Sequence, residues 1–508
     1  MSSEKTLANS ADTVGESRSE KVDIDKSNTL ADGNLLNDAV DGENREHQMG
    51  VWEAAKRYPW ACFWAFIMCF TIEMMESFDM FLNTDFVALE QFSKTYGVQT
   101  GPDSWAIPTR WQSALFQAGQ CGAFVGVYLA GPITNRFGYR WTTLLGLVLM
   151  NVTIFVSFFA NSLTLLVIGQ ALEGVPWGFF IANSPAYASE IVPLPLRAAC
   201  TATLQMSWSS GSIIVAGATY AYNGLDNQWS WRIPLMVLIF LAPESPEALR
   251  SIKRLGAKTE ERAQQSLAMI ECTVKIEEEQ MGGLPTLLDL VKGTDRRRTI
   301  ITWLVHASQN FAGNLIANQA TYFFEQAGIA SNKAFQLNLI TTSLQLVANT
   351  ASWFLTSWFW RRTVFLWDTA TNVLFLFIFG IIATVPQSHK INYAQACLCV
   401  IISFVYAGAQ GPISYTIISE TSSVRLRVLS TAIPMIYLAS RMLNTTGWNL
   451  AGKCGYVWGG TATVTWVLAY FFLSELKDRS YREADILFHR KVDARKFKST
   501  VIGVEEDE

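Results

Sequence analysis

Three carboxylic acids lie inside the first long apolar run of the sequence. Glu73, Glu76 and Asp79 are spaced three residues apart, which places them on neighbouring positions of one face if the run is a helix. An ionisable group inside a membrane span is costly and is therefore a functional candidate. Two close carboxyl groups can bind and release a proton, so Asp79 and Glu76 are candidate proton-coupling residues. The competing interpretation places them in water at the outer end of the run, since Asn83 and Asp85 follow.

Long apolar segments must position these acids. The chain has 508 residues, of which 50% are hydrophobic and 16% are charged, and its mean hydropathy is +0.20. An ordinary soluble domain is about 25% charged, so this composition favours membrane spans. Twelve apolar runs can be read, at 60–82, 111–131, 142–160, 163–188, 199–220, 231–242, 299–324, 335–359, 364–385, 393–418, 428–443 and 454–474. We therefore predict an all-α membrane protein with twelve transmembrane helices.

Two of the runs are too short for an ordinary span. A hydrocarbon core of about 30 Å requires about 20 helical residues, and the runs 231–242 and 428–443 both fall below that length. We therefore expect helices 6 and 11 to be abnormally short.

The basic residues predict the orientation in the membrane. They follow every second run, at Arg136 and Arg140, Arg197, Arg250 to Lys258, Arg296 to Arg298, Arg361 and Arg362, Arg425 and Arg427, and Lys477 to Lys491. The alternate loops carry few bases. Because positive residues mark cytoplasmic loops, we expect these loops and both termini in the cytoplasm.

The chain also repeats itself at an offset of roughly 220–230 residues, as parallel-repeat transporters do. Ser189 and Glu190 after the fourth run correspond to Ser419 and Glu420 after the tenth. We predict two pseudo-symmetric six-helix halves, with the following organisation: a disordered cytoplasmic tail at 1–55, the first half at 56–242, a cytoplasmic linker with short helices at 243–298, the second half at 299–474 and a cytoplasmic tail at 475–508.

Several motifs together resemble the sugar porter family of the major facilitator superfamily (MFS), and within it the fungal maltose/α-glucoside–proton symporters. The motifs are Asn135–Arg140, Gly169–Gly178, Ser189–Glu190 with Arg197, Pro243–Pro246, Thr321–Gly328, Gly411–Tyr415 with Glu420, and Trp458–Gly460. Each is weak alone, but their order and spacing are specific. The resemblance runs from about Trp60 to Lys498 and implies the MFS fold and alternating access.

The resemblance also implies a cytoplasmic gate made of charged residues. Its candidates are Arg136, Arg140, Glu190, Arg197, Arg362, Glu420 and Arg425. Glu190 with Arg197, and Glu420 with Arg425 or Arg427, can form ion pairs that lock the cytoplasmic side. The alternative is that these bases only set the topology. Gly138 permits a tight turn, and Trp360 stands where the second repeat usually has a glycine, a turn that a tryptophan makes less easily.

Polar groups in other runs match sugar-binding positions of the resembled family. They are Gln205 in the fifth run, Gln309 and Asn310 in the seventh, and Tyr415 in the tenth, and Asn314 in the seventh run adds polar capacity nearby. Sugar recognition needs a few well-placed polar groups and an aromatic face. The alternative role of such amides is hydrogen bonding between helices.

One departure concerns the proton-coupling acids. In the resembled symporters Asp79 and Glu76 match an acid pattern implicated in proton coupling, and a second-span glutamate follows a glycine. Here Ala123 follows Gly122, so that acid is missing. Glu173 in the fourth run is an additional acid, which either compensates for the loss or pairs with a nearby base.

We therefore predict a secondary active transporter that takes up maltose or another α-glucoside with protons, in the lipid bilayer of the plasma membrane. The alternatives are an MFS carrier that exports another small molecule, such as a secondary metabolite, and a sensor or inactive carrier. No nucleophile–base pair, phosphate loop or metal cluster supports an enzyme, a cofactor or a metal site. No basic domain indicates nucleic-acid binding, and the eight Cys residues form no CxxC pair.

Overall fold

A computed structural model describes residues 48–101, 104–223, 225, 227–241, 293, 295–309, 311, 321, 331–385, 388–421, 453–477, 479 and 481–500. All helices discussed below belong to one compact unit, formed by Gly50–Ile252 and Pro285–Val501. Most of the predicted N-terminal tail, the linker from 243 to 292 and the eleventh run lie outside the described residues.

The first group of helices surrounds one apolar core that includes Phe78, Phe180 and Trp231. Its long helices are α3 (Pro59–Phe86), α5 (Thr109–Phe158), α6 (Leu163–Ile191), α7 (Leu194–Tyr222) and α8 (Trp229–Leu241). The short helix α2 (Val51–Arg57) precedes α3, and α4 (Glu90–Tyr96) with the hairpin β1 (Val98–Gly101) and β2 (Ser104–Ala106) joins α3 to α5. Helix α8 is described over 13 residues, about 20 Å of rise. The described residues end at Leu241, so the abnormally short sixth span stays a prediction.

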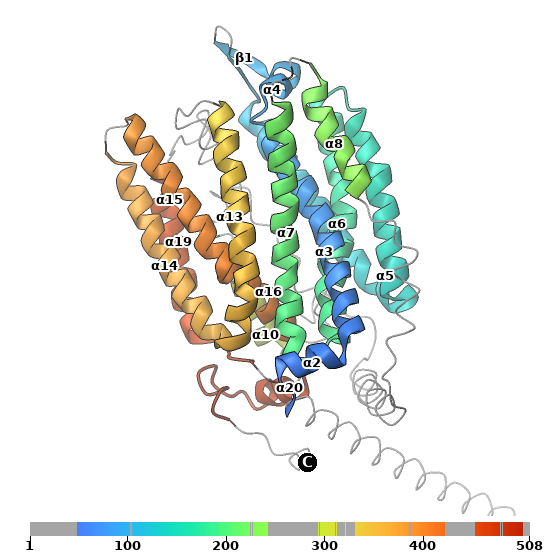
Figure 1. The fold of residues 1–508 in the computed structure, drawn as a ribbon, viewed down its shortest axis with the longest axis vertical. Helices are drawn as coiled ribbons and strands as arrows, with labels where there is room; N and C mark the ends of the chain where they lie inside the picture. Colours follow the sequence, from blue (N-terminus) through green and yellow to red (C-terminus); the bar gives the residue numbers. More distant parts are fainter. Residues whose placement is uncertain are drawn as a thin grey trace, which may run out of the picture. The chain divides into compact units, whose positions relative to one another are not determined.

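The second group has its own core around Leu376, Phe379 and Trp458. Its helices are α10 (Asp295–Gln309), α13 (Ser331–Trp358), α14 (Arg361–Ile382), α15 (His389–Gly408), α16 (Gln410–Thr421) and α19 (Cys454–Phe472), followed by α20 (Tyr481–His489). Helix α7 joins the two groups, since it packs against both α13 and α16 (Figure 1).

Three local breaks shape these helices. Gly138 interrupts α5 with φ 79° and ψ 165°, a conformation that only glycine adopts readily, so the second and third runs are separate segments as predicted. Ala409 separates α15 from α16 with φ −139° and ψ −67°, so the helix of the tenth run is interrupted at this residue. Trp360, by contrast, has φ −70° and ψ 126° at the start of α14. The expected difficulty at Trp360 does not arise, because this turn needs no left-handed residue.

Glycines bring α5 and α6 into backbone contact. A Cβ atom added at Gly126 would lie 2.0 Å from the carbonyl oxygen of Val175, and one added at Gly178 would lie 2.3 Å from that of Ala123. Small residues allow this close approach between membrane helices. The α5–α6 pair is therefore held at a spacing that larger residues would not permit.

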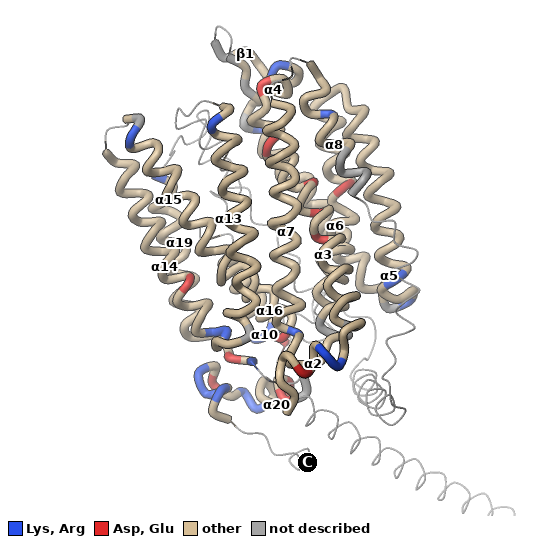
Figure 2. The backbone as a smooth tube through the Cα atoms, viewed as in Figure 1, with Lys and Arg blue, Asp and Glu red and all other residues tan. Residues whose placement is uncertain are grey.

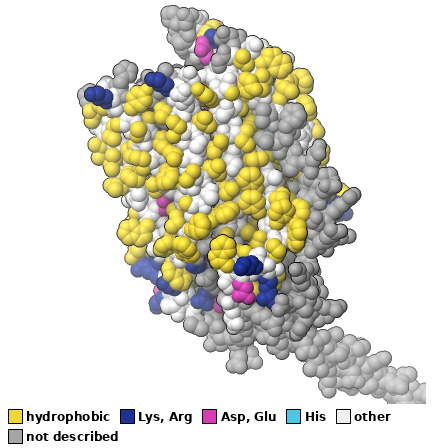
Figure 3. Space-filling model, in the orientation of Figure 1, with side chains coloured by type: hydrophobic (Ala, Val, Ile, Leu, Met, Phe, Trp, Pro, Cys, Tyr) yellow, Lys and Arg dark blue, Asp and Glu magenta, His cyan; other side chains and the backbone are white. Residues whose placement is uncertain are grey.

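The surface is apolar along the helices and basic mainly at one end of them. Exposed apolar side chains include Val148, Val152, Trp367, Leu374 and Val464, and yellow side chains cover much of the face in Figure 3. Figure 2 shows that most Lys and Arg residues lie at the end where α2 and α20 are found. This is the distribution expected of helices that cross a bilayer.

Within the described part of the chain, four helical segments are long and apolar enough to cross a membrane, or five if the bent pair of α2 and α3 is one span. The total of twelve spans stays a prediction, because parts of the seventh run and all of the eleventh are outside the described ranges.

Candidate transport site

The acids of α3 face the interior of the first helix group. Asp79 is 0% exposed and Glu76 1%, and Glu73 is also buried. The interpretation that places Glu76 and Asp79 in water at the end of the run is therefore wrong. Three buried carboxyl groups within two turns of one helix are costly unless protons or polar partners stabilise them.

Helix α6 supplies the polar partners of Asp79. The indole Nε1 of Trp177 donates to Asp79 Oδ2 at 3.1 Å. The carboxyl group of Glu173, one turn before Trp177, lies within hydrogen-bonding reach of the carboxyl group of Asp79. Asn83 donates to the side chain of Gln170, which in turn donates to Glu173 Oε2. The network therefore joins two acids, Asp79 and Glu173, on adjacent helices.

Two oxygens of this acid pair have unmet hydrogen-bonding capacity. Asp79 Oδ1 and Glu173 Oε1 are both buried and make no hydrogen bond of good geometry within the described ranges, although the hydroxyl of Ser157 lies close to the Glu173 carboxyl group. A hydrogen bond between two carboxyl groups requires a proton on one of them. One proton shared by Asp79 and Glu173 would satisfy both oxygens. The arrangement is chemically that of a proton-binding carboxyl pair.

Glu173 therefore lies beside Asp79, and no base in the described part of the chain forms an ion pair with it. Ala123, which occupies the position of the missing second-span acid, is buried where α5 packs against α6. Of the two roles considered for Glu173, the geometry matches that of a compensating acid.

Asp85 connects the two helix groups near the other end of α3. Its Oδ2 atom accepts from Thr219 on α7 at 3.2 Å, and its Oδ1 atom accepts from Thr321 at 3.3 Å. No role was predicted for Asp85, because nothing in the sequence shows that these two threonines meet the same carboxylate.

The candidate sugar-binding side chains cluster around the start of α16. A Cβ atom at Gly411 would lie 3.1 Å from Cδ of Gln205, so the Gln205 amide lies against this backbone. Gln309 on α10 accepts from the hydroxyl of Tyr406 at 3.1 Å, and its buried Nε2 has no acceptor within the described ranges. Tyr415 packs against Cys69, Ala188 and Leu204 of the first group.

Gln205 lies on α7, Gln309 on α10 and Tyr415 on α16, and both α7 and α10 pack against α16. Amide and aromatic groups on these three helices can meet one ligand. Asn310 and Asn314 lie outside the described residues. No group of three His, Cys, Asp or Glu side chains in the described ranges is placed to hold a metal ion.

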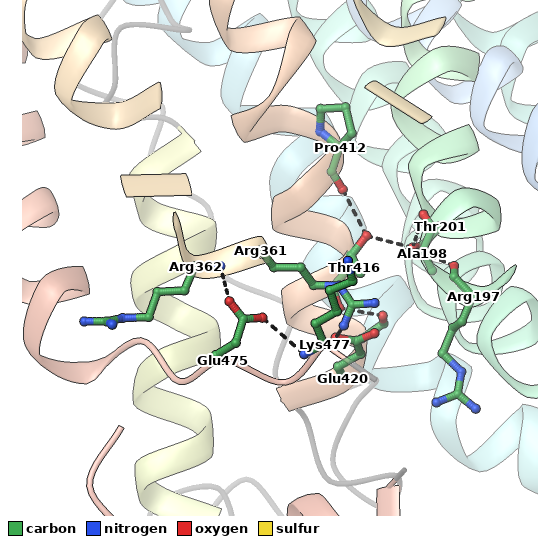
Figure 4. A network of polar contacts seen from close by, with 11 residues as sticks. Arg197, Ala198, Thr201, Arg361, Arg362, Pro412, Thr416, Glu420, Glu475 and Lys477 are labelled. Atoms are coloured by element: carbon green, nitrogen blue, oxygen red, sulfur yellow. Dashed lines mark hydrogen bonds and ion pairs between the residues drawn. The ribbon is translucent and has the colours of Figure 1, made fainter. Parts of the chain in front are cut away.

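At the end of the helices where α2 and α20 lie, the buried Arg361 and Glu420 form an ion pair between α14 and α16 (Figure 4). The sequence pointed to Arg362 instead, and the two adjacent arginines have different partners. Arg362 Nη2 donates to the carbonyl oxygen of Tyr470 at 2.8 Å, and its backbone N–H donates to Glu475 at 3.0 Å. Arg361 and Glu475 were not among the predicted gate residues. The sequence pattern of two arginines at the start of α14 and an acid near the end of α16 marks Arg361 as well as Arg362.

The same region holds a contact between the two helix groups. The hydroxyls of Thr201 on α7 and Thr416 on α16 are 2.8 Å apart, and Thr201 also bonds to the backbone oxygen of Arg197. Figure 4 shows the guanidinium of Arg197 directed away from Thr416. Helices α7 and α16 therefore touch near the Arg361–Glu420 ion pair.

Among the described residues, the remaining gate candidates take no part in the Arg361–Glu420 ion pair. Arg136 and Arg140 are exposed on either side of Gly138, and each guanidinium lies 5.7 Å from the ring of the next residue, Phe137 or Trp141. Glu190 lies near the end of α6, and Arg425 lies outside the described residues.

Two packed groups of helices with polar groups between them define the class of this protein, a membrane carrier with the MFS fold. Solved structures support the fold. A proton:xylose symporter of the MFS, XylE, bound to 6-bromo-6-deoxy-D-glucose, has a TM-score of 0.66 and 18% identity, covering 85% of this chain and 100% of that one. An inward-open XylE from E. coli has a TM-score of 0.59 and 18% identity, covering 84% of this chain and 99% of that one.

The chain belongs to the sugar (and other) transporter family, whose model matches residues 64–488. The general alpha-glucoside permease of Saccharomyces cerevisiae is 31% identical over 516 residues, covering 94% of this chain and 83% of that protein. A maltose permease of the same organism, MAL61, is 31% identical over 505 residues, covering 92% and 82%. The resemblance stated from the motifs is confirmed, and the protein is a multi-pass membrane transporter of the sugar class rather than an enzyme.

Proposed function

We propose that the protein imports maltose or another α-glucoside together with protons by alternating access. The observation that carries this proposal is the buried pair of Asp79 and Glu173, which lacks one proton to satisfy its oxygens. The substrate class comes from the relatives, which are named alpha-glucoside and maltose permeases.

The acid pair couples proton binding to helix movement. When one proton is bound, the two carboxyl groups share a single negative charge. Helices α3 and α6 then remain packed through Asp79, Glu173 and Trp177. When the proton leaves, two carboxylates repel each other in a low-dielectric interior, and the contact loses free energy. Glu76, whose buried Oε2 also has no donor within the described ranges, adds to that repulsion. Proton loading therefore favours one arrangement of the helices over another.

The sugar binds near the start of α16. Gln205 and Gln309 offer amide donors and acceptors for hydroxyl groups, and Tyr415 offers an aromatic face. Asn310 and Asn314 follow Gln309 in the seventh run, and we propose that they line the same site. Because these residues come from both helix groups, the ligand holds the groups together while the site is closed.

The cytoplasmic contacts form the inner gate. Arg361 with Glu420, and Thr201 with Thr416, close the ends of α7, α14 and α16. We further propose that the chain folds as two halves, at 56–242 and 299–474, and that both termini lie in the cytoplasm. We propose that the protein lies in the bilayer of the plasma membrane and binds no nucleic acid. Arg136, Arg140, Glu190, Arg197, Arg362 and Arg425 complete the gate in the other conformations of the cycle.

The export alternative relied on the missing acid at Ala123. Glu173 supplies a carboxyl group beside Asp79, so that reason no longer favours export. No contact within the described ranges favours a sensor.

The test is uptake of labelled maltose by cells that lack their own α-glucoside carriers. The proposal expects uptake at acidic external pH that falls as pH rises and collapses with a protonophore, because the proton is a co-substrate. Xylose and a non-sugar solute serve as competing substrates. Absence of α-glucoside uptake by protein that reaches the surface would contradict the substrate, and uptake insensitive to the protonophore would contradict the coupling.

A further inference from the structure

A buried carboxyl group in the second helix group takes no part in the contacts described so far. Asp368 lies on α14, two turns beyond Arg361, and is 7% exposed. No Lys, Arg or His within the described ranges forms an ion pair with it. A buried carboxylate without a counter-charge is unstable, and such a group binds a proton or a cation instead.

The immediate neighbours of Asp368 are neutral donors. Asn372 Nδ2, one turn further along α14, donates to Asp368 Oδ2 at 3.2 Å. The backbone of Gln410 lies close to the carboxyl group. Gln410 is the first residue of α16, directly after the non-helical Ala409. Asp368 therefore lies where α14 meets the start of α16.

Two buried acceptors beside Asp368 have no donor. The side-chain oxygens of Gln410 and Asn372 are fully buried, and no donor within the described ranges reaches either of them. The Gln410 amide nitrogen already donates to Ser308 at 3.2 Å, which fixes the orientation of the amide. A protonated carboxyl group gains one O–H donor. A proton on Asp368 would neutralise the buried acid and give this polar cluster one more donor.

The charged and titratable groups around Asp368 do not replace that proton. Helices α15, α16 and α19 pack against α14. On α15, the Tyr406 hydroxyl donates to Gln309, and Lys390 lies about 24 Å away along the helix axis from Tyr406. On α16, Glu420 pairs with Arg361 and Tyr415 packs against the first group. Helix α19 carries Cys454, Tyr456 and Tyr470 but no acid or base.

We propose that Asp368 is a second proton-binding site, which loads and releases its proton as the helix break between α15 and α16 changes during transport. Gln410 and Glu420 lie on the same short helix, so a change at the Asp368–Gln410 contact also moves the partner of Arg361. The exchange of this proton during transport rests on the proposed proton-coupled function. Proton binding itself does not.

The test is a pH titration of the purified full-length protein by infrared difference spectroscopy, which records carboxylic acid carbonyl bands directly. We expect Asp368→Asn to lose one such band that the wild type has, and Asp368→Glu to keep a band at a shifted frequency. Glu90→Gln is the control, because Glu90 is exposed and pairs with Lys94. Asp79→Asn should remove a different band. Equal monodispersity of the variants by gel filtration shows that they are folded.

In proteoliposomes, the number of protons carried per sugar should fall by about half in Asp368→Asn if each acid site contributes one proton. A spectrum of Asp368→Asn identical to that of the wild type, or an unchanged ratio of protons to sugar, would overturn the proposal. The spectrum requires no transport, so it tests Asp368 even if the protein carries no α-glucoside. Loss of transport in the wild type would contradict the proposed function alone.

Discussion

Removal of the guanidinium of Arg361 should open the cytoplasmic side. Arg361 and Glu420 are both buried, and each is no more than 6% exposed at its side chain. Breaking a buried ion pair by removing one partner costs about 3–5 kcal/mol, because the other charge is left unpaired. Glu420 has a further contact, so we take the lower value of about 3 kcal/mol, which is a factor of about 100 in an equilibrium constant.

The assay is labelling of a reporter, Thr201→Cys, by a membrane-impermeant maleimide applied from the cytoplasmic side in a background without other cysteines. Thr201 is fully buried against Thr416 in the closed arrangement. If the inner gate is closed for most of the time, Arg361→Ala should raise the labelling rate by about 100-fold, in proportion to the open population.

Arg362→Ala is the matched control for this measurement. Its guanidinium is partly exposed and donates to one backbone oxygen, while its backbone bond to Glu475 survives the substitution. An exposed interaction of this kind contributes about 1 kcal/mol or less, so labelling should change by less than about 5-fold. Equal labelling rates in the Arg361 and Arg362 variants would refute the assignment of the gate to Arg361.

Three further predictions test packing, the turn and the sugar site. Gly126→Ala should lower the thermal stability of the purified protein by about 1–3 kcal/mol, since its Cβ would overlap a backbone oxygen. Gly217→Ala, where no atom lies within 4 Å, should leave the stability unchanged. Gly138→Ala should cost about 1–2 kcal/mol through its positive φ, seen as a lower melting temperature, and an undiminished value would contradict the strain. Gln309→Ala should raise KM for the sugar by about 10-fold, because a hydrogen bond to the sugar is lost. Gln336→Ala, at an exposed position, should leave KM unchanged. Equal KM values for the two variants would show that Gln309 is not part of the site.

Most of the helices could be predicted from the sequence, because the length of an apolar run and the charge of a loop can be read from contiguous residues. The run 163–188 became α6, and Gly138 broke α5 at the expected turn, since only glycine readily adopts its φ. The helix break at Ala409 was not predicted, because the run 393–418 stays apolar across it.

The partners within the site needed the structure. Glu173 was recognised as an unusual acid, but a sequence does not show that α6 turns it toward Asp79 rather than toward a base. Arg361 and Arg362 are chemically identical and adjacent, and their side chains point about 100° apart on a helix. Only the packing of α16 against α14 decides which of them meets Glu420.

The most direct test of the account compares proton-driven accumulation with exchange in proteoliposomes. Asp79→Asn keeps the size of the side chain but cannot bind and release a proton. We predict that this variant exchanges labelled for unlabelled sugar at a rate close to that of the wild type and no longer accumulates sugar in response to a pH gradient. Glu173→Gln should behave likewise, and Glu90→Gln should behave like the wild type. Accumulation by Asp79→Asn equal to that of the wild type would contradict the claim that this buried acid pair couples protons to transport.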